Sequence, residues 1–485
     1  MKETDTMDIR NKKIDEDLFF KEREQVLSEW PTGKNVDLDE AIEFHKNLPP
    51  HKVWAKKMLD PRNRSETFAI TGMGKTTLEQ QIELLRYVQD EGQAELLGTS
   101  VDSFTRVHKY DVVEKGLRES IETGQSRLNG LPVVHHGVAG IRKIIESVDL
   151  PVQMRYGAAD PRLIDEIGFA GGHTGGSGDG LYNFWNMNSK LPPETVLRNH
   201  QYVHRLVGYY EEHGVPITPS CQGMYGGGIP SSLVMAALLT QMLMMAEQGV
   251  KHIMLHFTAQ GNLAQDVGSA HTLQKLASEY LDRFGRSDVM TILTTGLSLV
   301  GYPIELGSAF AAISFNSIVA KLCGAQINDI RTISEAMTIP TKEDIATTFR
   351  SAKVIVDLFK GQEIQINPKA LETEARMAEM ETRMILDRVI ELGDGDVAVG
   401  LVQAIQSGIL DHPFATSPLV ACQVMGIKDN AGAVRYLSHG NLPFTKEILT
   451  FHKEKITERE KTLGKKLGYE TVVNDLLAIS RGELI

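Results

Sequence analysis

The amino-acid sequence predicts an α/β protein built on a (β/α)8 TIM barrel, with an N-terminal helical wrap and a small C-terminal α-rich domain. From residue 68 onward, short apolar runs alternate with amphipathic helices, the pattern of a parallel sheet. Polar residues gather at the ends of several runs, as in barrels that assemble a catalytic centre from many strands. A doubly wound sheet predicts the same alternation but usually carries a glycine fingerprint after its first strand, and none stands there. We therefore place the wrap at residues 1–60, the barrel at 61–359 and the C-terminal domain at 360–485.

The composition favours a globular protein whose partners are small molecules or proteins. Of its 485 residues, 42% are hydrophobic, and the net charge of -12 disfavours nucleic acid or an anionic membrane as the main partner. The chain starts without the apolar centre of a signal peptide, and its longest nearly apolar run, Leu233–Ala246, is shorter than the roughly 20 residues that cross a bilayer. We expect a cytoplasmic protein without a membrane segment. Its three cysteines, without C-x-x-C spacing, support neither a disulfide framework nor a thiolate metal site.

The elements of the barrel are predicted in chain order. Residues 1–60 are charged and favour helices, with a break at Trp30, Pro31 and Gly33. The nine candidate strands are 68–71, 95–99, 131–136, 151–155, 168–172, 216–218, 251–257, 289–295 and 325–330. Nine runs exceed the eight strands of a closed barrel, so one lies outside it, and 168–172 has the least strand-like composition.

Polar side chains mark the ends of several predicted strands. They are Arg106, His135, His136, Arg155, Gln222 and His256. Adjacent residues of a strand point to opposite faces, so at most one of the two neighbouring histidines serves a site there. Convergence of the other side chains predicts a catalytic centre at the carboxyl ends of the strands.

The stretch 150–187 combines a cation, glycines and aromatic residues. Arg155 ends an apolar run, the glycine-rich segment 171–180 follows, and Tyr182, Trp185 and Asn186 come directly after it. Glycines allow close approach of the backbone to a bulky ligand, and a guanidinium pairs with a carboxylate. The stretch therefore suits a large planar ligand beside a carboxylate. The alternative is a surface loop after an ordinary salt-bridged arginine.

Other motifs have structural interpretations. GMGKTT at 72–77 resembles the end of a phosphate-binding loop, but Ala69 stands where the leading glycine belongs, which disfavours nucleotide hydrolysis. The loop follows the first predicted strand, so we still expect Lys75 to face the pocket. His200 and His204 lie one helical turn apart without the glutamate of H-E-x-x-H, so we expect packed or solvated histidines. In the C-terminal part, the stripe formed by Met377, Met380, Met384 and Ile385 predicts a packing surface, and the segments around 393–396 and 435–444 predict irregular turns.

Several phrases together resemble the epsilon chains of the glutamate mutase (methylaspartate mutase) family. They are IELLRYVQDEG at 82–92, SRLNGLP at 126–132, LPVQMRYG at 150–157, RLVGYYEEHGV at 205–215, AEQGVKHI at 246–253, SEAMTIPTKE at 334–343 and VRYLSHGNLPFT at 434–445. The resemblance implies a (β/α)8 barrel and an adenosylcobalamin cofactor bound jointly with a small subunit that carries a D-x-H-x-x-G segment. This chain has no such segment, so we expect no tight cobalamin binding by the chain alone. The resemblance also implies a homodimer of this chain within a heterotetramer.

The resemblance also implies a substrate site. The family holds two substrate carboxylates with three arginines, of which Arg106 and Arg155 match and the third falls on Gly72. Tyr182 matches a substrate tyrosine. Together with the two arginines it forms the catalytic set that the resemblance implies. The family's other substrate positions carry replacements here: Tyr156 for a histidine, Ser177 for an acid, Asn186 for a tyrosine and Ser220 for a further acid.

For the cofactor, the resemblance implies contacts from seven residues. They are Gly74, Asn129, Trp185, Tyr302, Arg331, Glu335 and Ile339. Arg331 stands where the family has lysine, and Trp185 stands where it has proline. The departures are therefore milder on the cofactor side than on the substrate side.

The implied function is that of the large catalytic subunit of an adenosylcobalamin-dependent carbon-skeleton mutase, an isomerase that interconverts L-glutamate and 3-methylaspartate. Gly72, Ser177 and Asn186 remove a clamp and an acid, so we expect glutamate to be a poor substrate. Lys75 replaces the lost cation only as a point charge. One alternative is the same chemistry on a small carboxylic acid that lacks the amine or the second carboxylate. Another is a non-catalytic barrel that binds a corrinoid partner.

Overall fold

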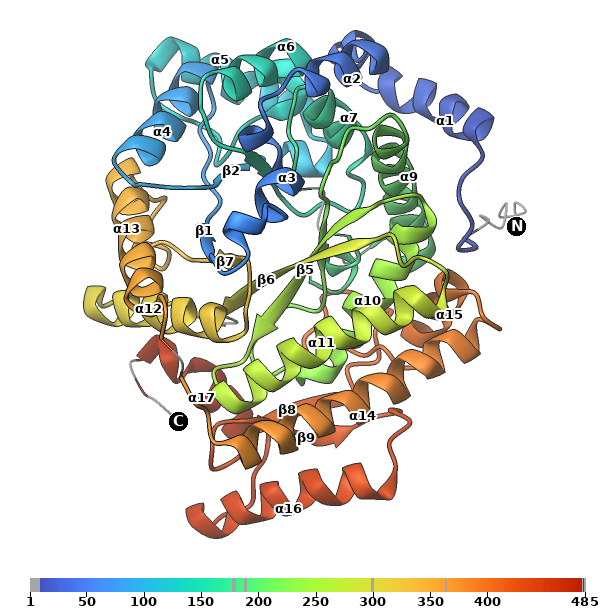
Figure 1. The fold of residues 1–485 in the computed structure, drawn as a ribbon, viewed down its shortest axis with the longest axis vertical. Coiled ribbons are helices and arrows are strands. Elements are labelled where there is room, and N and C mark those ends of the chain that lie inside the picture. The colour runs from blue at the N-terminus through green and yellow to red at the C-terminus, as the bar shows by residue number, and fades with distance from the viewer. Residues whose placement is uncertain are drawn as a thin grey trace.

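The computed structural model describes residues 9–176, 180–186, 190–297, 301–362, 364–481 and 483. For Tyr182, Asn183 and Ile479 it describes the backbone alone. Seven parallel strands lie at the centre of the described chain, inside a ring of helices (Figure 1). Their bounds are β1 (Phe68–Ile70), β2 (Leu97–Ser100), β3 (Val152–Arg155), β4 (Ser220–Gln222), β5 (His252–Ala259), β6 (Met290–Leu297) and β7 (Ile327–Asp329).

The predicted α/β class with a parallel central sheet is confirmed. One sheet has the order β1-β7-β6-β5-β4, and β2 pairs with β3 in a second parallel sheet. Isolated parallel bridges connect Met73 with Thr99, Gln153 with Gly175, and Gly175 with Thr218. These bridges extend the pairing from β1 to β2 and from β3 towards β4.

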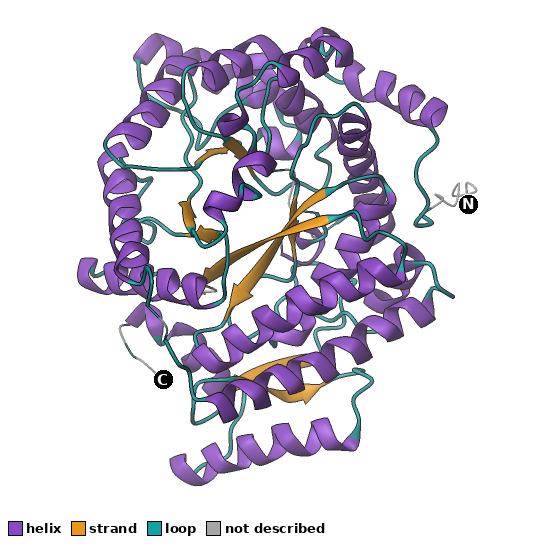
Figure 2. Ribbon diagram, viewed as in Figure 1, coloured by secondary structure: helices purple, strands orange, loops and turns teal. Residues whose placement is uncertain are grey.

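Most of the helices lie around the outside of the strands (Figure 2). Those of the first half are α1 (Glu16–Ser28), α2 (Leu38–Lys46), α3 (Trp54–Met58), α4 (Leu78–Asp90), α5 (Tyr110–Thr123), α6 (Val133–Glu146), α7 (Arg162–Ala170), α8 (Tyr182–Asn186) and α9 (Pro193–Glu212). They are followed by α10 (Ser231–Glu247), α11 (Leu263–Arg283), α12 (Leu306–Leu322) and α13 (Lys342–Leu358). No helix among the described residues has the length and apolarity needed to cross a membrane.

Two of the nine predicted strands are wrong, and a third, 216–218, lies just before β4 and contributes only the bridge at Thr218. Residues 131–136 contribute only a bridge from Leu131 to Val101, and α6 begins at Val133. Its buried positions Val134, Val138, Ile141 and Ile145 have helical spacing, which becomes visible only when the run is followed past its two histidines. Residues 168–172 span the end of α7 and the turn after it, and the strand-like pairing falls on Gly175 instead.

The N-terminal segment closes the amino end of the strands. In Figure 1, α3 lies across the centre of the ring. Trp54 is completely buried and packs with Met58, Phe68, Ile70 and residues of β5, β6 and β7. Its backbone N–H donates to the Thr174 hydroxyl over 3.1 Å, and a Cβ on Gly175 would lie 2.9 Å from its indole ring. The indole therefore requires glycine at the bridging position, because a side chain would overlap the ring.

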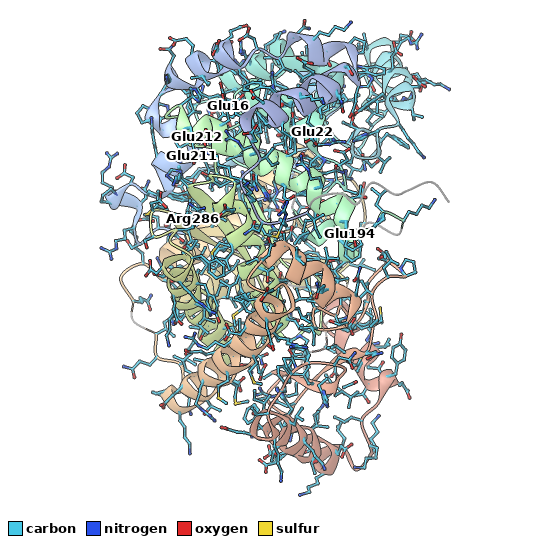
Figure 3. All side chains as sticks on the ribbon, turned by 90° about the vertical axis from the view of Figure 1, so that its right-hand side faces the viewer. Glu16, Glu22, Glu194, Glu211, Glu212 and Arg286 are labelled. Atoms are coloured by element: carbon cyan, nitrogen blue, oxygen red, sulfur yellow. The ribbon has the colours of Figure 1, made fainter. Side chains whose placement is uncertain are left out.

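Ion pairs fasten α1 and the residues before it to the outer helices. Figure 3 shows this side of the molecule, with Glu22 on α1 and Glu212 on α9 labelled. Glu22 accepts from Arg198 over 2.5 Å, and Glu212 accepts from Lys13 over 2.5 Å. Arg23 pairs with the fully buried Glu166 over 3.0 Å. Because a carboxylate buried without a partner is costly, the last pair ties α1 to α7 more firmly than the exposed pairs do.

The C-terminal residues form helices around a small antiparallel hairpin. The elements are α14 (Pro368–Leu392), α15 (Val397–Gln406), β8 (Val424–Lys428), β9 (Val434–His439), α16 (Lys446–Leu463) and α17 (Tyr469–Leu477). Met377 and Ile385 are buried where α14 packs along α10 and α11, which confirms the predicted packing stripe for these two residues. Met380 and Met384 are only half-buried. The prediction of irregular turns at 435–444 is wrong for 435–439, because alternation of Val434 and Tyr436 was hidden among polar residues.

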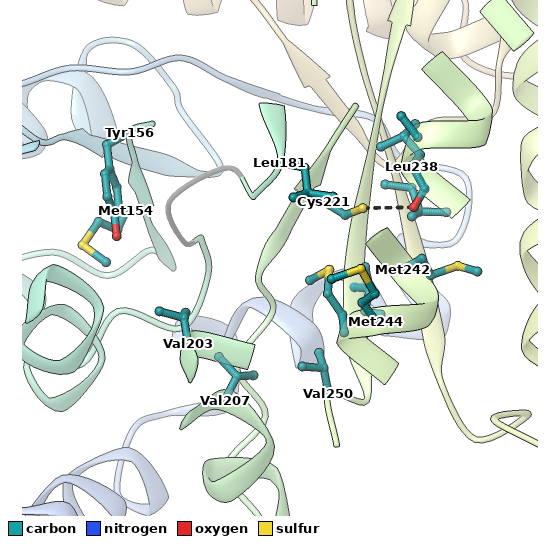
Figure 4. Packing of buried hydrophobic residues seen from close by; sticks show 14 of the residues in the cluster. Met154, Tyr156, Leu181, Val203, Val207, Cys221, Leu238, Met242, Met244 and Val250 are labelled. Carbon is teal, nitrogen blue, oxygen red and sulfur yellow. Dashed lines mark hydrogen bonds between the residues drawn. The ribbon is translucent and has the colours of Figure 1, made fainter. Parts of the chain in front are cut away.

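The outer core fixes which strand residues face the interior. Met154 of β3 and Cys221 of β4 belong to the buried cluster drawn in Figure 4, where the Cys221 thiol lies 3.4 Å from the Leu238 carbonyl oxygen of α10. Successive strand residues point to opposite faces. Burial of these two side chains outward therefore directs Arg155 and Gln222 towards the interior.

Candidate active site

A cavity of about 270 Å³ opens at the carboxyl ends of the strands. It brings together nine residues predicted from the sequence. They are Gly72, Arg106, Arg155, Tyr156, Ser220, Gln222, His256, Arg331 and Glu335. Ser220 and Gln222 are the first and last residues of β4, and His256 lies in the middle of β5. The predicted convergence of polar side chains from several strand ends therefore occurs in the folded chain.

Arg155 is held inside the cavity by a carboxylate from across the ring. Its Nη2 lies 2.8 Å from both carboxylate oxygens of Asp329 at the end of β7, and its Nη1 donates to the Gln153 side chain over 2.9 Å. The side chains are 22% and 16% exposed. Burial acts to raise the pKa of Asp329, but the nearby charges of Arg155, His256 and Arg331 prevail and lower it. Asp329 is therefore ionised at neutral pH.

His256 of β5 borders the same pair. Its Nε2 lies 3.4 Å from an Asp329 oxygen. Burial lowers the pKa of His256 to about 4, against the opposing effect of Asp329. The imidazole is consequently neutral at pH 7 and adds no charge to the cavity.

Arg106 is carried by a short turn after β2. Asp102 accepts hydrogen bonds from the backbone N–H groups of Phe104 over 2.9 Å and Thr105 over 3.1 Å, and from the Thr105 hydroxyl. These bonds fix the 3-10 turn Thr105–Val107, which contains Arg106. The turn aims the half-buried arginine at the cavity without a long ordered loop.

A second ion pair stands at the mouth of the cavity. Nη1 of Arg331 lies 3.0 Å from a Glu335 oxygen, and Nη2 lies 2.5 Å from the Tyr225 hydroxyl. The two charged side chains are 47% and 35% exposed. Solvent reaches this pair, so its partners exchange at little cost.

Glycines make room for Arg155. A Cβ on Gly98 of β2 would lie 2.6 Å from Cδ of Arg155, and one on Gly72 would lie 2.5 Å from the Ser100 hydroxyl and 3.6 Å from Nε of Arg155. Residue 72 has no side chain, so the position where the family has a third arginine is open space beside Arg155. Lys75 does not line the cavity, and its charge acts on Glu83 of α4, so it does not face the pocket as predicted.

Other predicted substrate residues have structural partners. The Tyr156 hydroxyl donates to Asp165 over 2.7 Å at the edge of the cavity. The Asn186 amide donates to the Tyr225 carbonyl oxygen over 2.7 Å and does not line the cavity. Ser177 lies outside the described residues, and so does the side chain of Tyr182.

Most of the predicted cofactor residues lie outside the cavity itself. Asn129 is exposed and accepts from the Ser103 N–H over 2.9 Å, and Ile339 is 63% exposed. The Tyr302 hydroxyl donates to the Ala309 carbonyl oxygen over 3.2 Å. A Cβ on Gly74 would lie 2.7 Å from the backbone of Gly130, so this glycine permits close packing of two loops. Trp185 is completely buried beside Phe184 and turns no face outward.

The histidines flagged in the sequence are structural. His136 contacts the Thr76 carbonyl oxygen over 2.8 Å, and His135 packs on Trp30, so neither projects from a strand end as predicted. His200 and His204 are buried on α9, where burial lowers the pKa of each, to about 4 and about 3. Within the described ranges, no group of three or more His, Cys, Asp or Glu side chains is arranged to hold a metal ion.

Sequence reasoning missed five polar residues of the cavity: Thr71, Ser100, Gln153, Tyr225 and Asp329. Asp329 offered a signal, since it is a carboxylate near the end of the predicted strand 325–330. Charged residues inside short buried strands are rare without a partner. Its partner Arg155 lies 174 residues away, which local patterns do not reveal.

A parallel sheet with a charged cavity at its carboxyl edge defines an α/β protein of the kind that binds small polar ligands at strand ends. The family described as "Methylaspartate mutase E chain (MutE)" matches residues 48–485. The chain therefore belongs to this family.

Curated relatives align with the chain over nearly its full length. It is 38% identical to the glutamate mutase epsilon subunit of Desulfitobacterium hafniense over 480 residues, which cover 99% of each chain. Identity to the glutamate mutase epsilon subunit of Treponema denticola is 38% over 477 residues, or 98% of each chain. The protein of the same name from Haloarcula marismortui is 33% identical over 476 residues, covering 98% of this chain and 96% of that one. The resemblance predicted from scattered phrases is confirmed.

Proposed function

We propose that this chain is the large catalytic subunit of an adenosylcobalamin-dependent carbon-skeleton mutase, an isomerase. The observation that carries the proposal is the convergence of Arg106, Arg155 and Arg331 in one cavity at the strand ends. A chain aligned throughout with glutamate mutase epsilon subunits has cationic groups where an acid substrate needs them. Arg106 and Arg155, placed together in a cavity at the strand ends, argue against a scaffold that only binds a partner.

We propose further that the central strands form a closed (β/α)8 barrel. The bridges at Met73, Gly175 and Thr218 support this, because they join β1 to β2 and carry the pairing from β3 to β4 through the segment around Gly175. That segment would count as the eighth strand position. Residues 61–359 would then be the catalytic domain, with the 1–60 wrap and the 360–485 domain packed on it.

The rim of the cavity fits a broad, flat ligand with polar edges. Phe104, Val107, Ile304, Met337 and Ile339 are exposed apolar residues on loops that follow β2, β6 and β7. Asn129 and the exposed Arg331–Glu335 pair add hydrogen-bonding groups beside them. A corrinoid has an apolar face and amide side chains, so apolar and polar groups on one rim suit it. We place Tyr302, Gly74 and Trp185 behind the rim residues, where they would support the residues that contact the corrinoid.

Adenosylcobalamin, when bound, supplies a carbon radical by homolysis of its carbon–cobalt bond. The chain's own residues bind and orient the acid substrate: Arg106 and Arg155 provide cationic donors, and Tyr182 provides a hydroxyl. Covering of the rim excludes water from the cavity, which protects a reactive intermediate from side reactions. Neutral His256 neither attracts nor repels the acid.

The rim also supports a protein partner. We propose that a small cobalamin-binding subunit with a D-x-H-x-x-G segment covers the exposed apolar residues, and that two copies of this chain assemble with it in a heterotetramer in the cytoplasm. Exposed apolar side chains gathered on loops of one face are typical of an interaction surface.

The test is reconstitution. The chain is mixed with a small cobalamin-binding subunit of the family and adenosylcobalamin, small carboxylic acids are added, and organic radicals are followed by electron paramagnetic resonance. We expect a radical signal that depends on both subunits and on the acid, and that disappears in Arg106→Lys but persists in the matched surface control Arg283→Lys, which is 55% exposed. Formation of the complex without a radical for any acid would contradict the catalytic role.

A further inference from the structure

We infer that Asp329 acts as a built-in carboxylate that occupies Arg155 and restricts the site to acids with a single carboxylate. The inference rests on the proposed function, whose substrate class it narrows. In this interpretation Asp329 is a specificity-determining residue. Its side chain stands where the second carboxylate of a diacid would otherwise be received.

The geometry of the pair leaves Arg155 without a complete pair of N–H donors for a substrate carboxylate. A guanidinium offers a carboxylate two paired edges, and Nη2 takes part in both of them. Both oxygens of Asp329 lie 2.8 Å from Nη2, and Gln153 accepts from Nη1 over 2.9 Å. A substrate carboxylate therefore cannot form a bidentate pair with Arg155 until Asp329 is displaced.

The fold holds Asp329 in that position. β7 pairs with β1 on one side and β6 on the other, with Asp329 in register with Ile70 and Gly296. A Cβ on Gly296 would lie 3.4 Å from Cβ of Asp329 and 3.1 Å from Nε2 of His256, so the glycine leaves room for both side chains. The carboxylate is thus part of the wall and not a mobile lid.

Asp329 already compensates the charge of Arg155 inside the cavity. The two side chains are 16% and 22% exposed, so solvent screens the pair only in part. His256, whose Nε2 lies 3.4 Å from Asp329, is neutral because burial lowers its pKa to about 4. A further carboxylate placed at Arg155 would face Asp329 without a cation from this histidine, which is unfavourable in a partly buried site.

The test compares three five-carbon acids that differ in one end group, together with L-glutamate, which is glutarate with an added 2-amino group. Dissociation constants of pentanoate, glutarate, 5-aminopentanoate and L-glutamate are measured by ligand-observed nuclear magnetic resonance on the purified full chain, which needs no cofactor. We expect pentanoate to bind wild type at least 10-fold more tightly than glutarate. Asp329→Asn keeps the shape of the side chain and an acceptor for Arg155. In this variant we expect the ratio of the glutarate to the pentanoate dissociation constant to fall at least 10-fold.

Two further variants keep the result interpretable. Asp329→Asn combined with Gly72→Arg adds a fourth guanidinium to the cavity and should favour glutarate further. The closest atom to a Cβ at residue 72 is the rotatable Ser100 hydroxyl oxygen, at 2.5 Å. Asp288→Asn, a control that is 60% exposed, should leave the ratio unchanged. Wild type that prefers glutarate, or an Asp329→Asn ratio equal to that of wild type, would overturn the inference. So would preference for 5-aminopentanoate that Asp329→Asn abolishes, because Asp329 would then be an ammonium receptor.

The same ligands separate this inference from the proposed function. Preference for pentanoate in the binding assay, with no radical from any acid in the reconstituted complex, would refute the mutase proposal and leave the role of Asp329 intact. A radical formed with glutarate as readily as with pentanoate would do the reverse.

Discussion

The cavity contains two arginine–carboxylate pairs whose chemistry is the same and whose surroundings differ. Arg155 and Asp329 meet across the ring of strands, 22% and 16% exposed, whereas Arg331 and Glu335 lie four residues apart on the rim, 47% and 35% exposed. Removing one member of a buried pair leaves an uncompensated charge, while an exposed pair contributes little to stability. The inner pair is therefore a fixed part of the pocket, and the outer pair is available for exchange with a ligand or partner.

The strongest test of this contrast is Arg155→Lys. Lysine keeps the charge but loses the planar donors that meet Asp329 and Gln153, so we expect turnover in the reconstituted complex to fall about 100-fold or more. Arg106→Lys should act similarly. Circular dichroism should report a folded chain in both variants. Near-wild-type turnover of both variants, with any accepted acid, would remove these arginines from the site.

The dependence of stability on pH also tests the surroundings of the inner pair. His256 has a folded pKa of about 4, below its usual value, so the unfolded chain binds more protons between pH 6.5 and 4. Stability contributed by keeping His256 neutral is therefore present above pH 6.5 and lost as the pH falls towards 4. The pKa of Asp329 is also lowered, and its contribution is lost at still lower pH.

We therefore expect His256→Gln to reduce the loss of unfolding free energy between pH 7 and 4.5 by about 2 kcal/mol relative to wild type. Urea titrations at both pH values measure the difference. Parallel pH profiles for the two proteins would mean that folding does not lower the pKa of His256.

The inner pair also shows how far the sequence alone reaches. Arg155 was predictable because a cation that ends an apolar run at a strand terminus points into a pocket. Its partner was not, because the register of β7 against β1 and the path around the ring decide that Asp329 faces Arg155. Local patterns contain no information on a contact between residues 174 positions apart.

A helix and an aromatic residue near the site also show the difference between what local patterns predict and what tertiary structure decides. The apolar positions of α6 have a helical period, but the short segment LPVVHH has the composition of a strand, so a short window gave the wrong element. Trp185 follows a glycine-rich segment, a pattern typical of ligand contacts, yet it is completely buried. Composition predicts that an aromatic residue packs against something, and only tertiary structure decides whether that is a ligand or the core.

The outer region has a smaller expected effect, which concerns binding. Met337 and Ile339 are 60% and 63% exposed on the rim. Changing both to aspartate should weaken the affinity for the small cobalamin-binding subunit about 10-fold, since charges replace apolar contact area. Val354 and Leu358 of α13, 57% and 61% exposed, give a matched double-aspartate control. Equal affinities for the two double variants, measured by calorimetry, would move the docking surface away from the rim.

The smallest expected effect is at the outer pair, and it is measured against the same change at the inner pair. Arg331→Met removes an exposed charge whose partner Glu335 stays hydrated, so the unfolding free energy should change by less than about 0.5 kcal/mol. Arg155→Met leaves Asp329 facing a largely buried wall and should cost about 2 kcal/mol, below the range for fully buried pairs because some solvent reaches the cavity. Urea unfolding of both variants at pH 7 measures the difference. If the two changes were equal, solvent would screen the inner pair as well as the outer one, and Asp329 would be too easily displaced to exclude a second carboxylate.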